Sequence, residues 1–156
     1  LLHEQLREGV VTKRYKALLV GEINQQEMAI DAPIEKLSGA MQERQVRISQ
    51  DGRRAYTHLK VVERYADCTL VDIGLATGRT HQIRVHARHI GHPVSGDDRY
   101  GDRDANARLR REAGLRRLFL HSTELGFRHP EHGREMTVLA PLSADLDKLL
   151  QRLGKG

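Results

Sequence analysis

The chain is poor in features that cross-link a protein or anchor it in a membrane. Cys68 is the only cysteine among 156 residues, so neither an intramolecular disulfide nor a CxxC metal knuckle can form. A single cysteine fits a reducing, cytoplasmic setting, which we therefore expect. The longest apolar runs, such as residues 17–20, are only a few residues long, which excludes a transmembrane helix and the apolar region of a signal peptide. Repeats, low-complexity tracts and linkers are absent, so we expect a single domain.

What the chain does have is an excess of arginine. Lys and Arg together number 26 against 21 Asp and Glu, which gives a formal net charge of +5. Of these cations 20 are arginine and 6 are lysine. Arginine binds phosphate with two parallel hydrogen bonds and stacks on bases, which favours a nucleic-acid partner. A GC-rich genome produces the same bias without any function, so composition alone leaves RNA or DNA binding open.

Hydrophobic periodicity predicts an α+β fold with a mixed, mainly antiparallel sheet and flanking helices. Alternating apolar residues bounded by turn-forming residues indicate the strands, and apolar residues spaced three or four apart indicate the helices. The expected strands cover residues 10–20, 29–37, 55–65, 69–77, 118–127 and 135–139. The expected helices cover residues 80–90, 105–112 and 145–153, the last of them capped by Ser143.

The helix expected at residues 80–90 places a cation in an unusual position. Ile83, Ala87 and Ile90 form its buried stripe, and Arg84 lies one position past that stripe, in the first turn. A cation there opposes the helix dipole at a cost of a few tenths of a kcal/mol, which favours a facing anion. The pattern alone also fits a surface arginine whose stem lies along the apolar edge.

Tyr15 lies within the first expected strand, on the same side as Val11, Ala17 and Leu19. Aromatic residues are common in half-buried strands, so this pattern by itself favours an ordinary core tyrosine.

Two further interpretations of the segment around Arg84 have little support. Residues 74–80 faintly resemble a phosphate-binding P-loop, but the two glycines are one residue too close and Arg replaces the required Lys. A metal site would need histidines on one helix face with a carboxylate at ligand spacing, and only two of the four candidates share a face. These candidates are His81, His86, His89 and His92, for which solvated or RNA-facing positions are favoured.

A set of short blocks in a fixed order carries a more specific signal. Residues 78–84 are G-R-T-H-Q-I-R, and G-H-P and G-D-D-R-Y-G follow at 91–93 and 96–101. The other blocks are K-R-Y-K-A-L-L-V-G at 13–21, L-F-L-H-S at 118–122, H-P at 129–130 and A-P at 140–141. Over nearly the whole chain these blocks resemble the pseudouridine synthases of the RluA/RluC/RluD type.

The resemblance implies an enzyme that isomerises uridines in large-subunit ribosomal RNA. Such enzymes flip the uridine out, cleave the N-glycosidic bond with help from an aspartate, and rejoin the rotated base through carbon. The resemblance further implies no metal, no organic cofactor, no membrane and a monomer. In the family, the second arginine of the G-R-x-H-Q-I-R motif pairs with the catalytic aspartate. In this sequence that arginine is Arg84. The tyrosine of the upstream block, here Tyr15, stacks on the target base and is implicated in proton transfer.

Residues that shape the cleft or contact RNA backbone are expected around these two catalytic candidates. The arginines near residue 110 have an alternative as a solvated helix face. The candidate RNA-binding residues are Arg79, Thr80, His81, Gln82, Arg99, Arg108, Arg110 and Arg111. His92 and His121 are expected to form structural hydrogen bonds.

One block of the family is missing from these 156 residues. The nucleophilic aspartate of the family lies in H-R-L-D-x-x-T-S-G, upstream of the tyrosine strand, and Asp97 and Asp98 are not substitutes for it. Leu1, Leu2 and Leu6 indicate a helix without an N-cap. We therefore expect residues 1–156 to be the C-terminal part of a catalytic domain and to be inactive alone. The alternative is a non-catalytic RNA-binding module with the same fold.

Overall fold

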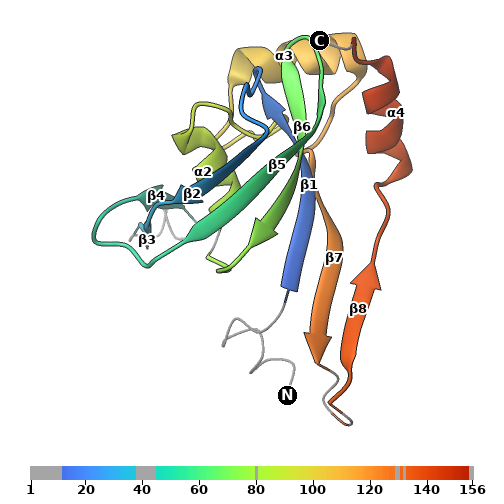
Figure 1. The fold of residues 1–156 in the computed structure, drawn as a ribbon. Coiled ribbons are helices and arrows are strands. Elements are labelled where there is room, and N and C mark those ends of the chain that lie inside the picture. Colours follow the sequence, from blue (N-terminus) through green and yellow to red (C-terminus); the bar gives the residue numbers. More distant parts are fainter. Residues whose placement is uncertain (1–11, 38–44, 80, 129–130, 132, 155–156) are drawn as a thin grey trace.

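The computed structural model describes residues 12–37, 45–79, 81–128, 131 and 133–154, and its main feature is a six-stranded sheet (Figure 1). The strands lie in the order β2-β5-β6-β1-β7-β8, and every neighbouring pair in the described residues is antiparallel. Their bounds are β1 Thr12–Val20, β2 Glu27–Asp31, β5 Tyr56–Arg64, β6 Cys68–Leu75, β7 Leu120–Arg128 and β8 Glu135–Leu139. The predicted α+β fold with a mainly antiparallel sheet is confirmed.

A small second sheet and the helices complete the described fold. Strands β3 (Ile34–Lys36) and β4 (Val46–Ile48) pair with each other, apart from the main sheet. The helices are α2 (Gln82–His89), α3 (Arg103–Ala113) and α4 (Ala144–Arg152). None of these helices has the length and apolar character that crossing a membrane requires.

Three details differ from the sequence prediction. The strand expected at residues 29–37 is two strands, because the chain leaves the edge of the main sheet before Pro33, which has no N–H to donate. Helix α2 begins at Gln82 because His81 has a φ of 52°, in the left-handed region. Ser143 occupies the N-cap position of α4, but its side chain caps none of the N–H groups of the helix, and its Oγ accepts from Arg117.

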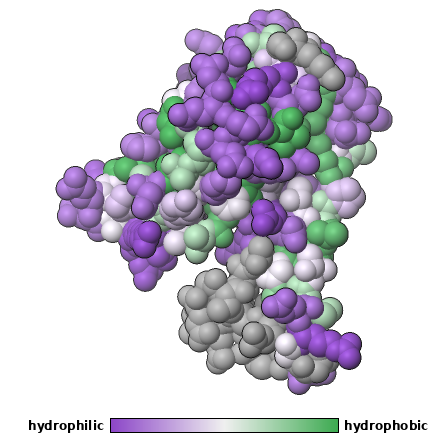
Figure 2. Space-filling view, in the orientation of Figure 1, coloured by the Kyte–Doolittle hydropathy of each residue, from purple (hydrophilic) through white to green (hydrophobic). Residues whose placement is uncertain are grey.

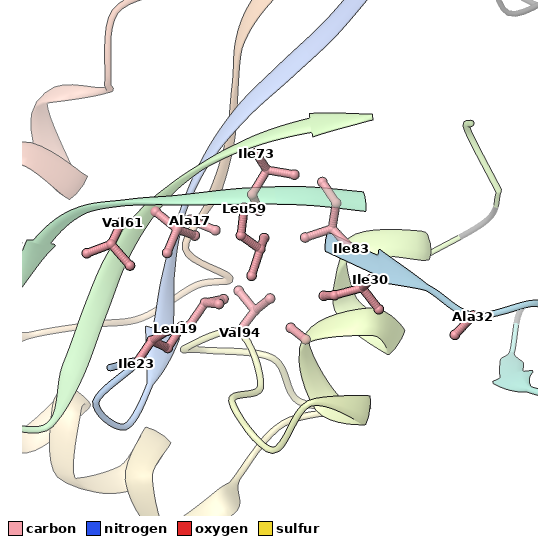
Figure 3. Close-up of a cluster of buried hydrophobic side chains, with 12 residues drawn as sticks. Ala17, Leu19, Ile23, Ile30, Ala32, Leu59, Val61, Ile73, Ile83 and Val94 are labelled. Carbon is pink, nitrogen blue, oxygen red and sulfur yellow. The ribbon is translucent and has the colours of Figure 1, made fainter. Parts of the chain in front are cut away.

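The middle of β1 is covered on both faces of the sheet. Ala17, Leu18 and Leu19 are each 0% exposed, which requires cover above and below because neighbouring side chains point to opposite faces. Ala17 and Leu19 pack with Ile83 of α2 in one cluster (Figure 3), and Leu18 packs in another with residues of α3 and α4.

The loop between α2 and α3 is tied firmly to β1, and this fixes the position of its aspartate. The Ser95 N–H donates to the Leu18 carbonyl, and the Phe119 N–H donates to the Ser95 carbonyl. Gly96 has a φ of +82°, and a Cβ there would lie 2.1 Å from the Arg117 carbonyl oxygen. Only glycine fits this close approach, so the chain path that leads into Asp97 is tightly constrained.

Candidate active site

Arg84 and Asp97 form the best-defined polar pair in the described part of the chain. Arg84 Nε donates to Asp97 Oδ2 at 2.8 Å, and its Nη2 donates to Oδ1 at 2.7 Å. The Asp97 side chain is 0% exposed and the Arg84 side chain 16% exposed. The anion expected opposite the first-turn cation of this helix is therefore Asp97, from the G-D-D-R-Y-G block.

Backbone groups complete the environment of Asp97. Its Oδ1 also accepts from the N–H groups of Arg99 and Tyr100, at 3.0 and 2.9 Å. Burial alone would raise the pKa of Asp97, but the hydrogen bonds from Arg84, Tyr100 and Arg99 outweigh burial and hold that pKa below its usual value. The hydrogen bond to Asp97 also raises the pKa of Arg84. The pair is thus a fixed, ionised unit.

Tyr100 connects this pair to α2 and to the small sheet. The Arg84 guanidinium carbon lies 5.1 Å from the centre of the Tyr100 ring, within the range of a cation–π contact. The Tyr100 hydroxyl accepts from the Val46 N–H at 3.1 Å and lies 2.9 Å from His81 Nδ1. Asp97 and Tyr100 were not among the residues predicted for the site: the G-D-D-R-Y-G block marks the segment that contains both but does not indicate that this segment packs against Arg84.

Gln82 does not have the position expected of an RNA-binding residue. It is 2% exposed, and its side-chain oxygen accepts from Thr77 Oγ1 and from the Arg79 N–H. Its Nε2 donates to the Tyr56 carbonyl and to Thr57 Oγ1. Because all four hydrogen-bonding positions are used inside the fold, Gln82 holds α2 against β5.

The histidines of this region have several different environments. His86 is 0% exposed; its Nε2–H donates to the Ala32 carbonyl, and its Nδ1 lies 2.7 Å from Thr57 Oγ1. The expectation of a solvated or RNA-facing His86 is therefore wrong, since the side chain completes a buried network. His92 and His121 bond to the carbonyl oxygens of Val20 and Ala140, the structural role expected of them. Among the described residues, no three or more His, Cys, Asp or Glu are placed to bind a metal ion.

Tyr15 lies on β1 opposite Ile73 of β6, half-buried at the border of the cluster shown in Figure 3. Burial raises the pKa of its hydroxyl, so the phenol stays neutral near neutral pH. That Tyr15 and Arg84 line the same cleft, which the family resemblance implies, stays a prediction.

The predicted RNA-binding arginines do not form one group. Arg79 follows β6 and its Nε donates to the Arg54 carbonyl, whereas Arg108 lies 3.9 Å from Asp67, just before β6 begins. The length of an eight-residue strand separates these positions. Arg110 and Arg111 are exposed in the last turn of α3, at an end of the molecule rich in hydrophilic residues (Figure 2). Arg99 is also exposed, and Thr80 lies outside the described residues.

Comparison with known proteins places these features in a family. Residues 1–89, which include Tyr15 and Arg84, match the model of the RNA pseudouridylate synthase family. The ribosomal large subunit pseudouridine synthase C of Escherichia coli K12 is 47% identical over 153 residues, covering 97% of this chain and 48% of that protein. The enzyme with the same description from Haemophilus ducreyi is 45% identical over 152 residues, covering 97% of this chain and 47% of that protein.

A solved structure agrees with the sequence matches. Human RNA pseudouridylate synthase domain containing 1 superposes with a TM-score of 0.78 at 31% identity, covering 99% of this chain and 63% of that one. The chain spans about half the length of the curated relatives it matches. From the family match over more than half of its residues and the shared fold, the chain belongs to the RNA pseudouridylate synthase family.

Proposed function

We propose that the protein carrying this chain converts specific uridines of large-subunit ribosomal RNA to pseudouridine, in the cytoplasm, as a monomer and without a metal or organic cofactor. The observation that carries the proposal is Arg84, which lies within the matched family region and is held by two hydrogen bonds to a fully buried carboxylate. A guanidinium fixed in this way keeps its position and charge while a substrate binds. The relatives described as large-subunit synthases support ribosomal RNA as the substrate.

The two catalytic candidates have different parts in this proposal. Arg84 orients the reacting aspartate, and Tyr15 stacks on the extruded uracil with its ring. A half-buried tyrosine is apolar behind and polar at its hydroxyl, which suits a flipped base. Flipping costs a few kcal/mol, and contacts between the +5 chain and the RNA backbone offset part of that cost.

Asp97 is not the reacting aspartate in this proposal. It is 0% exposed on its side chain, and Arg84 and two backbone N–H groups already occupy its oxygens. The 156 residues contain no H-R-L-D block. We therefore expect the polypeptide of residues 1–156 alone to leave uridine unchanged in large-subunit RNA.

The test uses the protein as its gene encodes it, returned to a strain from which that gene is deleted. Pseudouridines in large-subunit RNA are mapped chemically for the wild type, Arg84→Met and Tyr15→Phe. The wild type should restore sites that the deletion strain lacks, and both variants should lose them. Arg84→Lys, which keeps the charge but not the paired hydrogen bonds, should retain less activity than the wild type. Full activity in Arg84→Met would overturn the role given to Arg84.

A second candidate is a non-catalytic RNA-binding module of the same fold, which the excess of arginine, 20 of the 26 cations, favours. The same experiment separates the two functions. A binding module would leave the pseudouridine map of the deletion strain unchanged, while the purified protein would still bind large-subunit RNA with an affinity that falls as salt rises.

A further inference from the structure

A cavity of about 270 Å³ lies between α2 and the small sheet, and the mechanism above does not use it. Val46 and Ile48 of β4 and Val85 of α2 give it apolar walls, and Tyr100 also lines it. The volume lies just below the range of about 300–1,000 Å³ that is typical of small-molecule sites, which suits a single planar ring system.

The ionisable groups at the opening of the cavity are two arginines and a histidine. Arg47, Arg88 and His89 line it, and no Asp or Glu is among its lining residues. Arg47 pairs with Glu35 at 3.2 Å, outside the lining. The side chains of Arg88 and His89 are exposed, and in the described part of the chain neither forms a hydrogen bond or ion pair. An apolar floor with two arginines at its opening matches a nucleobase joined to phosphate.

The cavity adjoins Arg84. Arg88 lies four residues after Arg84 on α2, so the two side chains lie about one turn apart on the same helix face. Tyr100 contacts Arg84, because the Arg84 guanidinium lies over its ring, and Tyr100 also lines the cavity. Arg88, an exposed residue of the cavity lining, is therefore about one helix turn away from Arg84, a distance that neighbouring nucleotides of one RNA strand span.

We propose that the cavity binds a second unpaired nucleotide of the RNA substrate, close in sequence to the target uridine. The base lies against Val46, Ile48 and Val85, and Arg88 contacts an adjoining phosphate. The proposal rests on the proposed function, since it takes Arg84 as the place of the target. It makes the cavity a determinant of which uridines are modified, because only RNA that can unpair at both positions binds fully.

The first experiment fills the cavity in the protein as its gene encodes it. Ile48→Phe should raise KM for a large-subunit RNA fragment about tenfold, the order expected when one base loses its contacts, and should leave kcat nearly unchanged. Val62→Phe is the matched control, because Val62 is 43% exposed on β5 and outside the cavity; it should behave as the wild type. Equal KM values for Ile48→Phe and the wild type would overturn the proposal.

The second experiment does not depend on how well a filled variant folds. Wild-type protein is tested with RNA fragments in which single nucleotides near the target are made abasic in turn. One position should lose about tenfold in affinity, and that loss should disappear in Ile48→Phe, because both changes remove the same contact. The cavity proposal fails, and the proposed function stands, if the wild type still forms pseudouridine but no abasic position shows a loss of affinity that disappears in Ile48→Phe. If the wild type forms none, the proposed function fails first.

Charge supplies a third measurement. Arg88→Gln should reduce the slope of log affinity against log salt by about 0.7, the value for one phosphate contact on a single strand. Lys148→Gln, which removes an exposed cation from α4, should leave the slope unchanged. Equal slopes for Arg88→Gln and the wild type would remove the phosphate contact from the proposal.

Discussion

Replacing Arg84 with methionine tests the central pair of the structure. The change keeps an unbranched side chain beside Tyr100 but removes both hydrogen bonds to Asp97. Asp97, which is 0% exposed on its side chain, then keeps only the two bonds from backbone N–H groups. A buried carboxylate without its cation is costly.

The loss in free energy of unfolding caused by Arg84→Met, and the dependence of that loss on pH, follow from the ionisation of Asp97. Breaking a buried ion pair from one side costs about 3 kcal/mol. In the wild type the pKa of Asp97 lies below its usual value, so its contribution to stability is present above about pH 4 and is lost as pH falls further. In Arg84→Met the opposing effect of burial dominates and raises that pKa, so acid protonates Asp97 and relieves the penalty. The difference in free energy of unfolding between the wild type and Arg84→Met therefore becomes smaller as pH falls.

Urea unfolding measures both quantities. The free energy of unfolding of Arg84→Met and wild type should differ by about 3 kcal/mol near pH 7 and by clearly less near pH 4.5. Arg117→Met is the matched control, because Arg117 pairs with Asp145 at 2.9 Å while both side chains are about half exposed, and it should show no measurable loss at either pH. A loss for Arg84→Met that is the same at both pH values would refute the argument from the buried carboxylate.

Three further outcomes are expected. Gly96→Ala should destabilise the protein by clearly more than Gly91→Ala in urea unfolding: both positions have a φ of +82°, but only the Cβ at 96 meets a carbonyl, that of Arg117. Burial lowers the pKa of His86, so stability should fall as pH drops below about 6.5, where the unfolded chain binds the proton more readily; His86→Gln should remove that slope. Arg79→Gln should weaken binding of large-subunit RNA and flatten its salt dependence, and an unchanged salt slope would exclude a phosphate contact there.

Sequence patterns predicted the elements of this fold where the signal is local. The hairpin expected at residues 55–65 and 69–77 is β5 and β6, Tyr56–Arg64 and Cys68–Leu75. Alternating apolar residues on each side of a short turn contain the information for this pairing, and no distant residue is needed to specify it.

The partner of Arg84 was beyond the reach of such patterns. Asp97 lies 13 residues away, and its approach depends on the path of the α2–α3 loop. Hydrogen bonds between Ser95 and both Leu18 and Phe119 set that path. Those contacts join three separate segments, so neither periodicity nor spacing within one segment encodes them.

The burial of Gln82 and His86 was mispredicted for a related reason. Gln82 was expected to contact RNA because it lies in the motif, and His86 was expected to be solvated or to face RNA because its spacing did not fit a metal site. In the structure, a series of hydrogen bonds satisfies these groups inside the fold. Gln82 Nε2–H donates to Thr57 Oγ1, Thr57 Oγ1 lies at hydrogen-bond distance from His86 Nδ1, and His86 Nε2–H donates to the Ala32 carbonyl. Thr57 is 1% exposed on β5 and needs these partners. Their burial follows from contacts with Thr57, which lies 25 residues before Gln82 and 29 residues before His86.

The geometry of Arg84 also limits how a reacting aspartate can approach it. Asp97 uses Nε and Nη2, and within the described residues Nη1 has no hydrogen-bond partner. The family pattern pairs this arginine with the catalytic carboxylate, and a guanidinium has five N–H groups in a planar fork. A second carboxylate therefore has to bind through the N–H groups of Nη1 and Nη2 that Asp97 leaves free, and the exposed carboxylate of Asp98 already lies 3.9 Å from Nη2. In the proposed function Arg84 then pairs with Asp97 and with the reacting aspartate at the same time. The buried Asp97 fixes the plane of the guanidinium, and this plane sets the direction of the second pair. Because lysine has no such fork, Arg84→Lys keeps the charge but loses this control of direction.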